Sequence, residues 1–236
     1  MGLTISYTLS LQEGVSSSVV RELVRRTALY ARKIGCVEVG RVLRADGRED
    51  LAPLYFYLGK PKGSYITWAA PEHGWLVQVL PGAGCETARF GVCQYPRRVP
   101  YGDGYAPTGY RGGWRFHCSC KTQYAGAHGW ENFLQCHLRV ISLLDFWRGL
   151  GARVRVEDEG GFWKTRSVDK LREGLRGYDS LVAAMSGVLK DAGGGLPVKA
   201  PIFDYADFER LEHEGWQEFG GQIERLREQL SRLRVQ

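Results

Sequence analysis

The chain has 236 residues, of which 44% are hydrophobic and 25% are charged, and this composition excludes a mainly disordered polypeptide. No apolar run approaches the roughly 20 residues that cross a bilayer, and the start MGLTISYTLSL lacks the basic region of a signal peptide. The formal net charge of +6 is uneven, with 14 basic and 9 acidic residues up to Gly113 and 18 and 17 beyond it. We therefore expect a soluble cytoplasmic protein without a membrane, whose six cysteines are reduced thiols.

The first ninety residues predict a β-α-β unit followed by a hairpin. Residues 3–11 alternate apolar with polar, which is typical of a strand with one buried face. Serines at 16–18 then precede an apolar stripe with helical spacing that Gly35 ends. A short strand at 37–42, a loop and the runs YITWAA, GWLVQVL and ETARFGVC complete this half, residues 1–90.

Residues 91–113 have no periodicity and are predicted to link two halves. The segment is rich in Tyr, Gly, Pro and Arg, side chains that suit either a recognition surface or an ordered crossing loop. A structureless segment of this length is uncommon unless it has a function. Both hypotheses stay open for its candidate ligand-binding residues, which are Arg97, Arg98, Tyr101, Tyr105 and Tyr110.

Residues 114–203 predict a second half of ferredoxin-like order, β-α-β-β-α-β. The expected elements are a strand at 114–123, a helix at 130–148, a strand at 154–156, a strand at FWKTR, a helix after Ser167 and a last strand at PVKAPIF. The stretches KIGCVEV and GLGARVRV occupy equivalent places after their helices, which suggests that the halves are an internal repeat.

Residues 204–236 are expected to form C-terminal helices interrupted at Gly220–Gly221. Their apolar stripe is short, so we favour docking on the same chain, with a homo-oligomer or protein partner as the alternative. The fold class is thus α+β, with two pseudo-repeated halves and C-terminal helices.

The stretch WRFHCSCKTQY separates into two sets when it is treated as a strand. Its apolar set contains Cys118 and Cys120, which we expect to face the helices with Cys136 as small buried hydrophobes. A zinc site completed by Cys136, His137 or His128 and a reactive thiol are the alternatives. No P-loop, GxGxxG, GxSxG or HExxH motif is present, and neither a metal nor a cofactor is expected.

The opposite set of this strand is the candidate site. Basic and aromatic groups on a sheet face suit an anionic ligand, and RRM-type modules hold single-stranded RNA on such a face, although the aromatic motifs of that family are absent here. The candidate ligand-binding residues on this face are Arg115, Ser119, Arg153, Arg155 and Trp163. An equally open expectation is that this face lies opposite the polar face of residues 4–10 and encloses a pocket.

Three functional hypotheses follow from these patterns. The first is a binding or interaction module that uses the polar sheet face and the Tyr/Arg-rich segment. The second is an enzyme in which His117 is the acid or base, Lys121 binds an anion and Tyr124 assists. The third is a single-stranded nucleic-acid binder, which the positive first half supports.

Overall fold

The computed structural model describes residues 3–58, 65–192, 200–205 and 207–233. The strands are β1 (Thr4–Leu11), β2 (Glu38–Val39), β3 (Leu43–Arg44), β4 (Leu54–Leu58), β5 (Tyr65–Ala69), β6 (His73–Leu80), β7 (Ala88–Gln94), β8 (Arg98–Tyr101), β9 (Gly104–Pro107), β10 (Trp114–Lys121) and β11 (Arg153–Asp158). The α-helices are α1 (Ser17–Lys33), α2 (Trp130–Gly149), α3 (Phe162–Thr165), α4 (Val168–Ala192) and α5 (Phe208–Leu233), and the 3-10 helices are η1 (Gln123–His128) and η2 (Pro201–Asp204).

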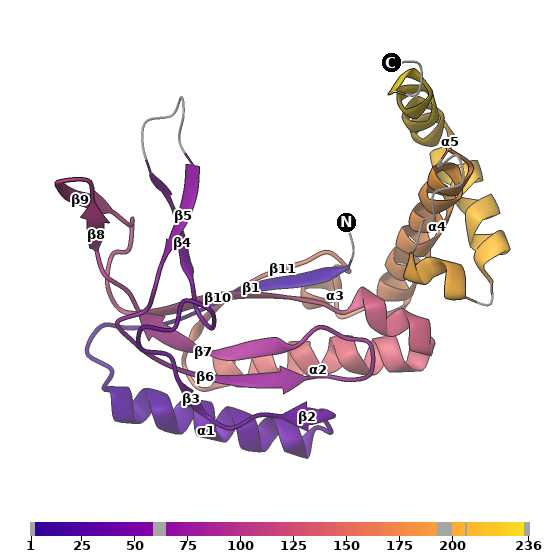
Figure 1. Cartoon of the computed structure of the whole chain (residues 1–236). Coiled ribbons are helices and arrows are strands. Elements are labelled where there is room, and N and C mark those ends of the chain that lie inside the picture. The colour runs from indigo at the N-terminus through magenta and orange to yellow at the C-terminus, as the bar shows by residue number, and fades with distance from the viewer. Residues whose placement is uncertain (1–2, 59–64, 193–199, 206, 234–236) are drawn as a thin grey trace.

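An antiparallel sheet organises this α+β protein. Its strand order is β11-β1-β10-β7-β6-β2, and β3 also pairs with β6. The helices α1 and α2 cover one face, and none of the described helices covers the other (Figure 1). We call the side of α1 and α2 the helix-covered face and the opposite side the open face.

The main core lies between the sheet and the two helices. The alternation of β1 places Ile5, Tyr7 and Leu9 on the helix-covered face, where all three are buried. Their partners include Phe90 of β7, which stacks on Tyr7, and Trp147 of α2. The α1 helix starts where Ser16 accepts a hydrogen bond from the Val19 N–H, as the serine run predicted.

Two hairpins rise from the open side of the sheet (Figure 1). One is β4–β5 and the other is β8–β9, and each is a separate two-stranded sheet. They share a small apolar cluster in which Phe56, Leu58 and Ala69 of the first hairpin pack with Ala106 of the second. The hairpins therefore support each other above the main sheet.

A helical arm made of α4 and α5 projects from one end of the sheet (Figure 1). The two helices approach closely at Gly215, where an added Cβ would lie 2.1 Å from the Ser180 carbonyl oxygen. Beyond it, Ile223 of α5 is buried against Ala184 and Val188 of α4. The helix α5 thus packs on its own chain, and it continues through Gly220–Gly221 where the sequence predicted a break.

The predicted ferredoxin-like order within residues 114–203 is wrong in two places. The stretch FWKT is the helix α3, because the Asp158 carboxylate accepts hydrogen bonds from the Gly160 and Trp163 N–H groups and thereby turns the chain into a helix. Residues 201–204 of the expected last strand form η2, and residues 197–199 lie outside the described residues.

The predicted division into two halves also differs from the structure. The strand β1 lies between β10 and β11, so residues 1–90 and 114–203 contribute to one sheet. The segment 91–113 contains the end of β7 and the β8–β9 hairpin, so it is not a structureless linker. The strand β10 pairs with β1 on one side and with β7 on the other, so it joins the two predicted halves directly.

Candidate functional site

The open face carries polar side chains in cross-strand rows. Ser10 of β1 pairs with Arg153 of β11 on one side and Arg115 of β10 on the other. In the next row Thr8 pairs with Arg155 and His117 in the same way. Because side chains alternate along a strand, the members of a row project from one face of the sheet.

The two predicted polar faces are therefore neighbours and do not oppose each other. The serines and threonines of β1 stand directly beside the outward residues of β10, from Thr4 at Lys121 to Ser10 at Arg115. The expected pocket between two facing sheets is not formed by these residues, since they belong to adjacent strands of one sheet.

Three arginines converge in a depression of about 540 Å³ on the open face, which we call the arginine depression. Its charged lining residues are Arg115, Arg153 and Arg155, and Thr8, Ser10 and Gln12 supply its polar side chains. No carboxylate lines it. Among the described residues, none of the three guanidinium groups has a hydrogen-bond or ion-pair partner, so all three are free to bind an anion.

The main sheet is split between β7 and β10. Among the described residues, the two strands share a single paired position, at Arg115 and Cys93. They meet again at Glu86, whose N–H donates to the Lys121 carbonyl at 3.2 Å and whose Oε2 accepts from the Lys121 N–H at 2.9 Å. Between these points the Tyr7 hydroxyl reaches across and donates to the Arg89 carbonyl at 2.7 Å.

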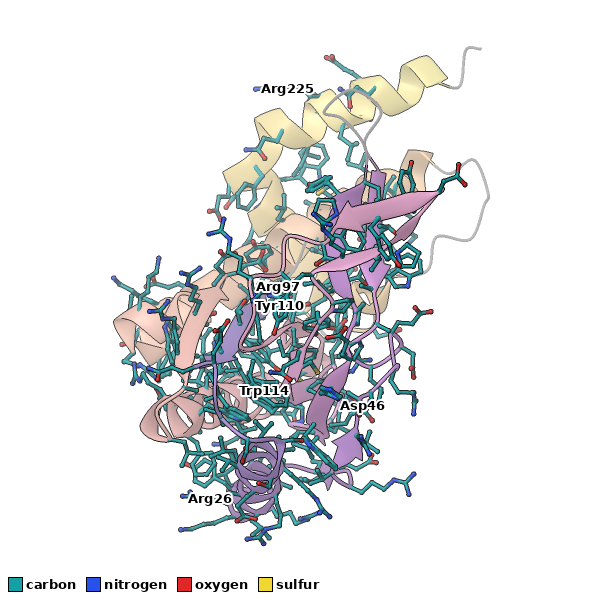
Figure 2. All side chains as sticks on the ribbon, turned by 90° about the vertical axis from the view of Figure 1, so that its left-hand side faces the viewer. Arg26, Asp46, Arg97, Tyr110, Trp114 and Arg225 are labelled. Carbon is teal, nitrogen blue, oxygen red and sulfur yellow. The ribbon has the colours of Figure 1, made fainter. Side chains whose placement is uncertain are left out.

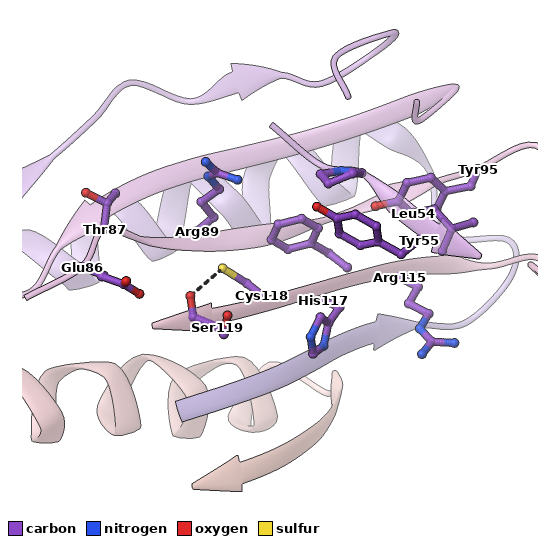
Figure 3. A pocket seen from close by; sticks show the side chains of 12 residues that line it. Leu54, Tyr55, Glu86, Thr87, Arg89, Tyr95, Arg115, His117, Cys118 and Ser119 are labelled. Atoms are coloured by element: carbon purple, nitrogen blue, oxygen red, sulfur yellow. Dashed lines mark hydrogen bonds between the residues drawn. The ribbon is translucent and has the colours of Figure 1, made fainter. Parts of the chain in front are cut away.

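A cavity of about 710 Å³ lies over this split, and we call it the split-sheet cavity (Figure 3). One end is lined by apolar and aromatic side chains and the other by polar groups. The apolar end consists of Pro53, Leu54, Tyr55, Tyr95 and Phe116, with Arg115 beside it, and the polar end consists of Glu86, Thr87 and Ser119 (Figure 3). Arg89, His117 and Cys118 lie between the two ends (Figure 3).

His117 is the titratable side chain at the centre of this surface. Its Nδ1 lies 3.2 Å from the Thr8 hydroxyl. Burial and the charge of Arg115 lower the pKa of His117 below its ordinary value, and Glu157 opposes this shift. The imidazole is therefore neutral at pH 7, when one ring nitrogen can accept a hydrogen bond and the other can donate one.

The three residues proposed for catalysis do not line one cavity. His117 borders the split-sheet cavity, whereas Lys121 and Tyr124 stand together at the end of β10. There the Lys121 ammonium lies 5.6 Å from the centre of the Tyr124 ring. Ser119 separates the two groups along the strand and lines the cavity with His117.

The other predicted ligand-binding residues are dispersed. Trp163 lies on α3, packs against the core of the helix-covered face and contacts Arg148 and Arg166, so it is not on the open face. Arg97 is 4.0 Å from Glu13. The remaining residues belong to the segment 91–113, in which Arg98, Tyr101 and Tyr105 are exposed on β8–β9, whereas Tyr110 packs against Tyr95 and donates to the Gly113 carbonyl.

Sequence reasoning missed an aromatic surface on the β4–β5 hairpin. Tyr55, Tyr57, Ile66 and Trp68 are exposed there, and the Tyr55 and Trp68 rings meet edge to face at 6.5 Å. The alternation of LYFYL, in which the tyrosines separate Leu54, Phe56 and Leu58, is the signal that could have located it.

This aromatic surface is continuous with the site. A third depression, of about 350 Å³, is lined by Tyr55, Trp68, Pro53 and Arg89 together with Glu49 and Asp50. It shares Pro53, Tyr55 and Arg89 with the split-sheet cavity, which in turn shares Arg115 with the arginine depression. The three hollows thus form one track across the open face.

The helix-covered side holds a buried Asp–His–Thr arrangement that the sequence did not indicate. His137 of α2 places Nδ1 3.0 Å from the Thr122 hydroxyl and Nε2 3.4 Å from the Asp158 carboxylate. Burial alone would raise the pKa of Asp158, but His137 and the N–H groups of Trp163 and Gly160 lower it. The His137 side chain has no exposed surface and that of Asp158 only 2%, so the group is closed to a substrate.

The thiols around β10 are not activated, although Cys118 is only partly buried while Cys85 and Cys120 are buried. Cys120 Sγ donates to the Glu86 carbonyl and lies 3.7 Å from Cys85 Sγ. Burial raises the pKa of the Cys118 thiol, and the contact with Cys120 raises that of Cys85. Both are therefore protonated at pH 7 and poor nucleophiles. Within the described part of the chain, no three His, Cys, Asp or Glu side chains stand close enough to share a metal ion.

Comparisons with family models, with curated proteins and with solved structures give no match to this chain. None of the helices in the described ranges has the length and hydrophobicity that crossing a membrane requires. The function must accordingly be argued from the open face itself.

Proposed function

We propose that the protein binds single-stranded nucleic acid along the track on its open face. The observation that carries this proposal is the arginine depression, in which Arg115, Arg153 and Arg155 face one hollow without an acidic partner among the described residues. Guanidinium groups bind phosphate oxygens in a planar, bidentate manner, and neighbouring arginines can neutralise successive phosphates.

Aromatic side chains at the other end of the track support a nucleic acid over a small anion. Tyr55, Tyr57 and Trp68 present rings to solvent on the hairpin that borders the split-sheet cavity. Bases of an unpaired strand stack on such rings whatever their sequence, whereas the bases of a duplex are stacked on one another. Phosphates at the arginines and bases at the rings would together hold an extended strand.

The connectivity of the sheet supports the same kind of module. The strands β1 and β7, between which α1 and the strands β2 to β6 lie in the chain, are parallel and separated by β10, and β10 and β11, joined through α2, are parallel and separated by β1. We propose that these are two interleaved β-α-β units of a ferredoxin-like sandwich built from both halves of the chain. Such a sheet has one face free for a ligand.

Salt-dependent binding tests the proposed function. Fluorescence anisotropy with labelled 20-nucleotide RNA and DNA single strands should show binding that weakens steeply between 50 and 300 mM salt. A duplex of the same sequence should bind at least several-fold more weakly, because its bases cannot reach the aromatic rings. No binding to either single strand at 50 mM salt would overturn the proposal.

A pair of matched variants locates the binding. Arg153→Ala with Arg155→Ala should reduce the affinity at least tenfold and lessen the salt slope by about 1 to 1.5, since each phosphate contact with a single strand contributes about 0.7. The control is Arg26→Ala with Arg225→Ala, two exposed arginines on α1 and α5 that lie far from Trp114 at the start of β10 (Figure 2). Equal losses of affinity in both double variants would mean that binding depends only on the net charge of the protein.

Acid–base chemistry at His117 is a second candidate function. The specific observation in its favour is a neutral imidazole on the wall of a cavity of ligand size. Lys121 and Tyr124 do not line that cavity, so the proposed chemistry would rest on His117 and its neighbours Thr8 and Ser119. Turnover of a ligand bound in the cavity should then disappear in His117→Asn, and unchanged turnover would dismiss this candidate.

A further inference from the structure

The split between β7 and β10 is bordered by defined contacts at both ends. The strands pair at Arg115 and Cys93, and they meet again where the Glu86 backbone and side chain both bond Lys121. Between these contacts the Tyr7 hydroxyl of the helix-covered side spans the gap by its hydrogen bond to the Arg89 carbonyl, so the space for a ligand lies on the open side. The cavity above the split, of about 710 Å³, lies within the range of roughly 300–1,000 Å³ that holds small ligands.

The two ends of the split-sheet cavity suit the two properties of a nucleobase. Tyr55 supplies an exposed ring at one end, against which a heterocycle can stack, whereas the Phe116 ring beside it is buried. Thr87, Ser119 and the Glu86 carboxylate supply hydrogen-bonding groups at the other (Figure 3). A ligand that is apolar on its faces and polar along its edge meets both requirements.

The Glu86 carboxylate determines which hydrogen-bonding edge of a nucleobase fits the split-sheet cavity. Its Oε2 accepts the Lys121 N–H at 2.9 Å, which fixes the side chain, and the carboxylate points toward the cavity (Figure 3). A carboxylate only accepts hydrogen bonds, so it pairs best with two adjacent donors. Guanine offers such a pair in its N1–H and its exocyclic amino group, whereas adenine places an acceptor beside its amino group.

Arg115 connects this cavity to the phosphate-binding part of the track. It lines both the split-sheet cavity and the arginine depression. A nucleotide whose base enters the cavity can therefore keep its phosphate at the arginines. We propose that the split-sheet cavity is a base-recognition subsite for one guanine of a bound strand, an inference that deepens the proposed function and rests on it.

Mononucleotides test the subsite separately from strand binding. Calorimetry or NMR titration with GMP, IMP, AMP, UMP and ribose 5-phosphate should give the tightest binding for GMP, about tenfold tighter than for AMP. IMP, which lacks the exocyclic amino group, should fall between them. Binding of GMP that is no tighter than that of AMP or ribose 5-phosphate would overturn the proposal.

The variant Glu86→Gln tests the role of the carboxylate. The amide oxygen can keep accepting the Lys121 N–H while the amide nitrogen becomes a donor, which mismatches the donor edge of guanine. We expect Glu86→Gln to remove the roughly tenfold preference for GMP. The control is Glu157→Gln, an exposed carboxyl on β11 outside the cavity lining, which should retain the preference. Loss of the preference in both variants, or in neither, would contradict the assignment.

A strand without guanine separates the two proposals. Oligo-uridine should bind the wild type and Glu86→Gln equally and with the same salt slope, because the arginine depression is unchanged. Failure of oligo-uridine to bind at all refutes strand binding along the track, whereas salt-dependent binding of oligo-uridine without any GMP preference refutes the guanine subsite alone. The wild-type mononucleotide series gives its answer even where a variant folds poorly.

Discussion

The two faces of the main sheet carry the same contact between a threonine and a histidine, with opposite consequences. On the open face Thr8 Oγ1 lies 3.2 Å from His117 Nδ1, and on the helix-covered side Thr122 Oγ1 lies 3.0 Å from His137 Nδ1. The buried pair is completed by Asp158 and has the composition of a catalytic triad, but α2 and β11 enclose it. The exposed pair has no hydrogen-bonded carboxylate among the described residues, and it borders a cavity. Access to solvent, more than residue composition, separates a functional group from a structural one.

The arginines repeat this contrast. On the helical arm, Arg176 and Arg210 are both paired with Glu214. In the arginine depression, Arg153 and Arg155 have no such partner among the described residues. Paired arginines hold helices together, whereas unpaired arginines on one surface repel one another and attract anions.

The largest expected effect comes from deleting each histidine in turn. His137→Ala should lower the free energy of unfolding by about 3–5 kcal/mol, because it leaves a buried carboxylate without its partner and opens a cavity. His117→Ala removes an exposed side chain and should change the free energy of unfolding by no more than about 0.5 kcal/mol. Denaturant unfolding at pH 7 measures both variants. Equal losses would refute the structural distinction between the two faces.

Two buried carboxyl groups with opposite pKa shifts extend the comparison to the pH dependence of stability. Asp158, beside His137, has a lowered pKa, whereas burial raises the pKa of Asp179 to about 6 and outweighs the hydrogen bond from Gln123, which lowers it. Since the folded-state pKa of Asp179 exceeds its unfolded value, its burial costs stability at pH 7, and the cost disappears as the pH falls from about 6 toward 4.

Asp179→Asn should therefore stabilise the protein at pH 7, by about 1–3 kcal/mol, and have little effect at pH 4. The amide can still accept the Gln123 hydrogen bond through its oxygen. Thermal unfolding of the wild type and the variant across pH 4–8 measures the difference. A constant difference across this range would show that Asp179 does not titrate as expected.

A smaller effect is expected from the aromatic end of the track. Trp68→Ala should weaken single-strand binding about tenfold without altering the salt slope, because stacking of a base on a ring releases no counterions. The control is Tyr105→Ala, which removes another exposed ring, on β8–β9 outside the three hollows. Loss of the salt slope in Trp68→Ala would mean that this hairpin contacts phosphates.

Strand parity is the part of the site that the sequence predicted well. Alternation within WRFHCSCKTQY separated Arg115 and His117 from Cys120, and the structure places the first two on the open face and buries the third. Parity is a local property and holds wherever the strand pairs. It could not show that β1 lies beside β10, because pairing between residues more than a hundred positions apart is decided by the whole sheet.

The errors have equally physical causes. Asp158, which lies between the expected strands at 154–156 and FWKTR, accepts backbone N–H groups and starts α3, so Trp163 does not lie on the polar sheet face where it was predicted. His137 fits the helical periodicity of α2, which gives no sign of its contact with Asp158. The exposed ring of Tyr55 was missed because its short strand lay within a segment that was treated mainly as loop, and that of Trp68 because the run YITWAA was not assigned to pair with that strand.

Photo-crosslinking of a bound strand tests most directly whether the open face is the binding surface. A single strand with 4-thiouridine at several positions would be irradiated on the full-length protein, and the linked peptides identified by mass spectrometry. We predict crosslinks in β4–β5, around Tyr55 and Trp68, and in β10 and β11. Crosslinks confined to α1, α2 or α5, with the open face unlabelled, would contradict the account.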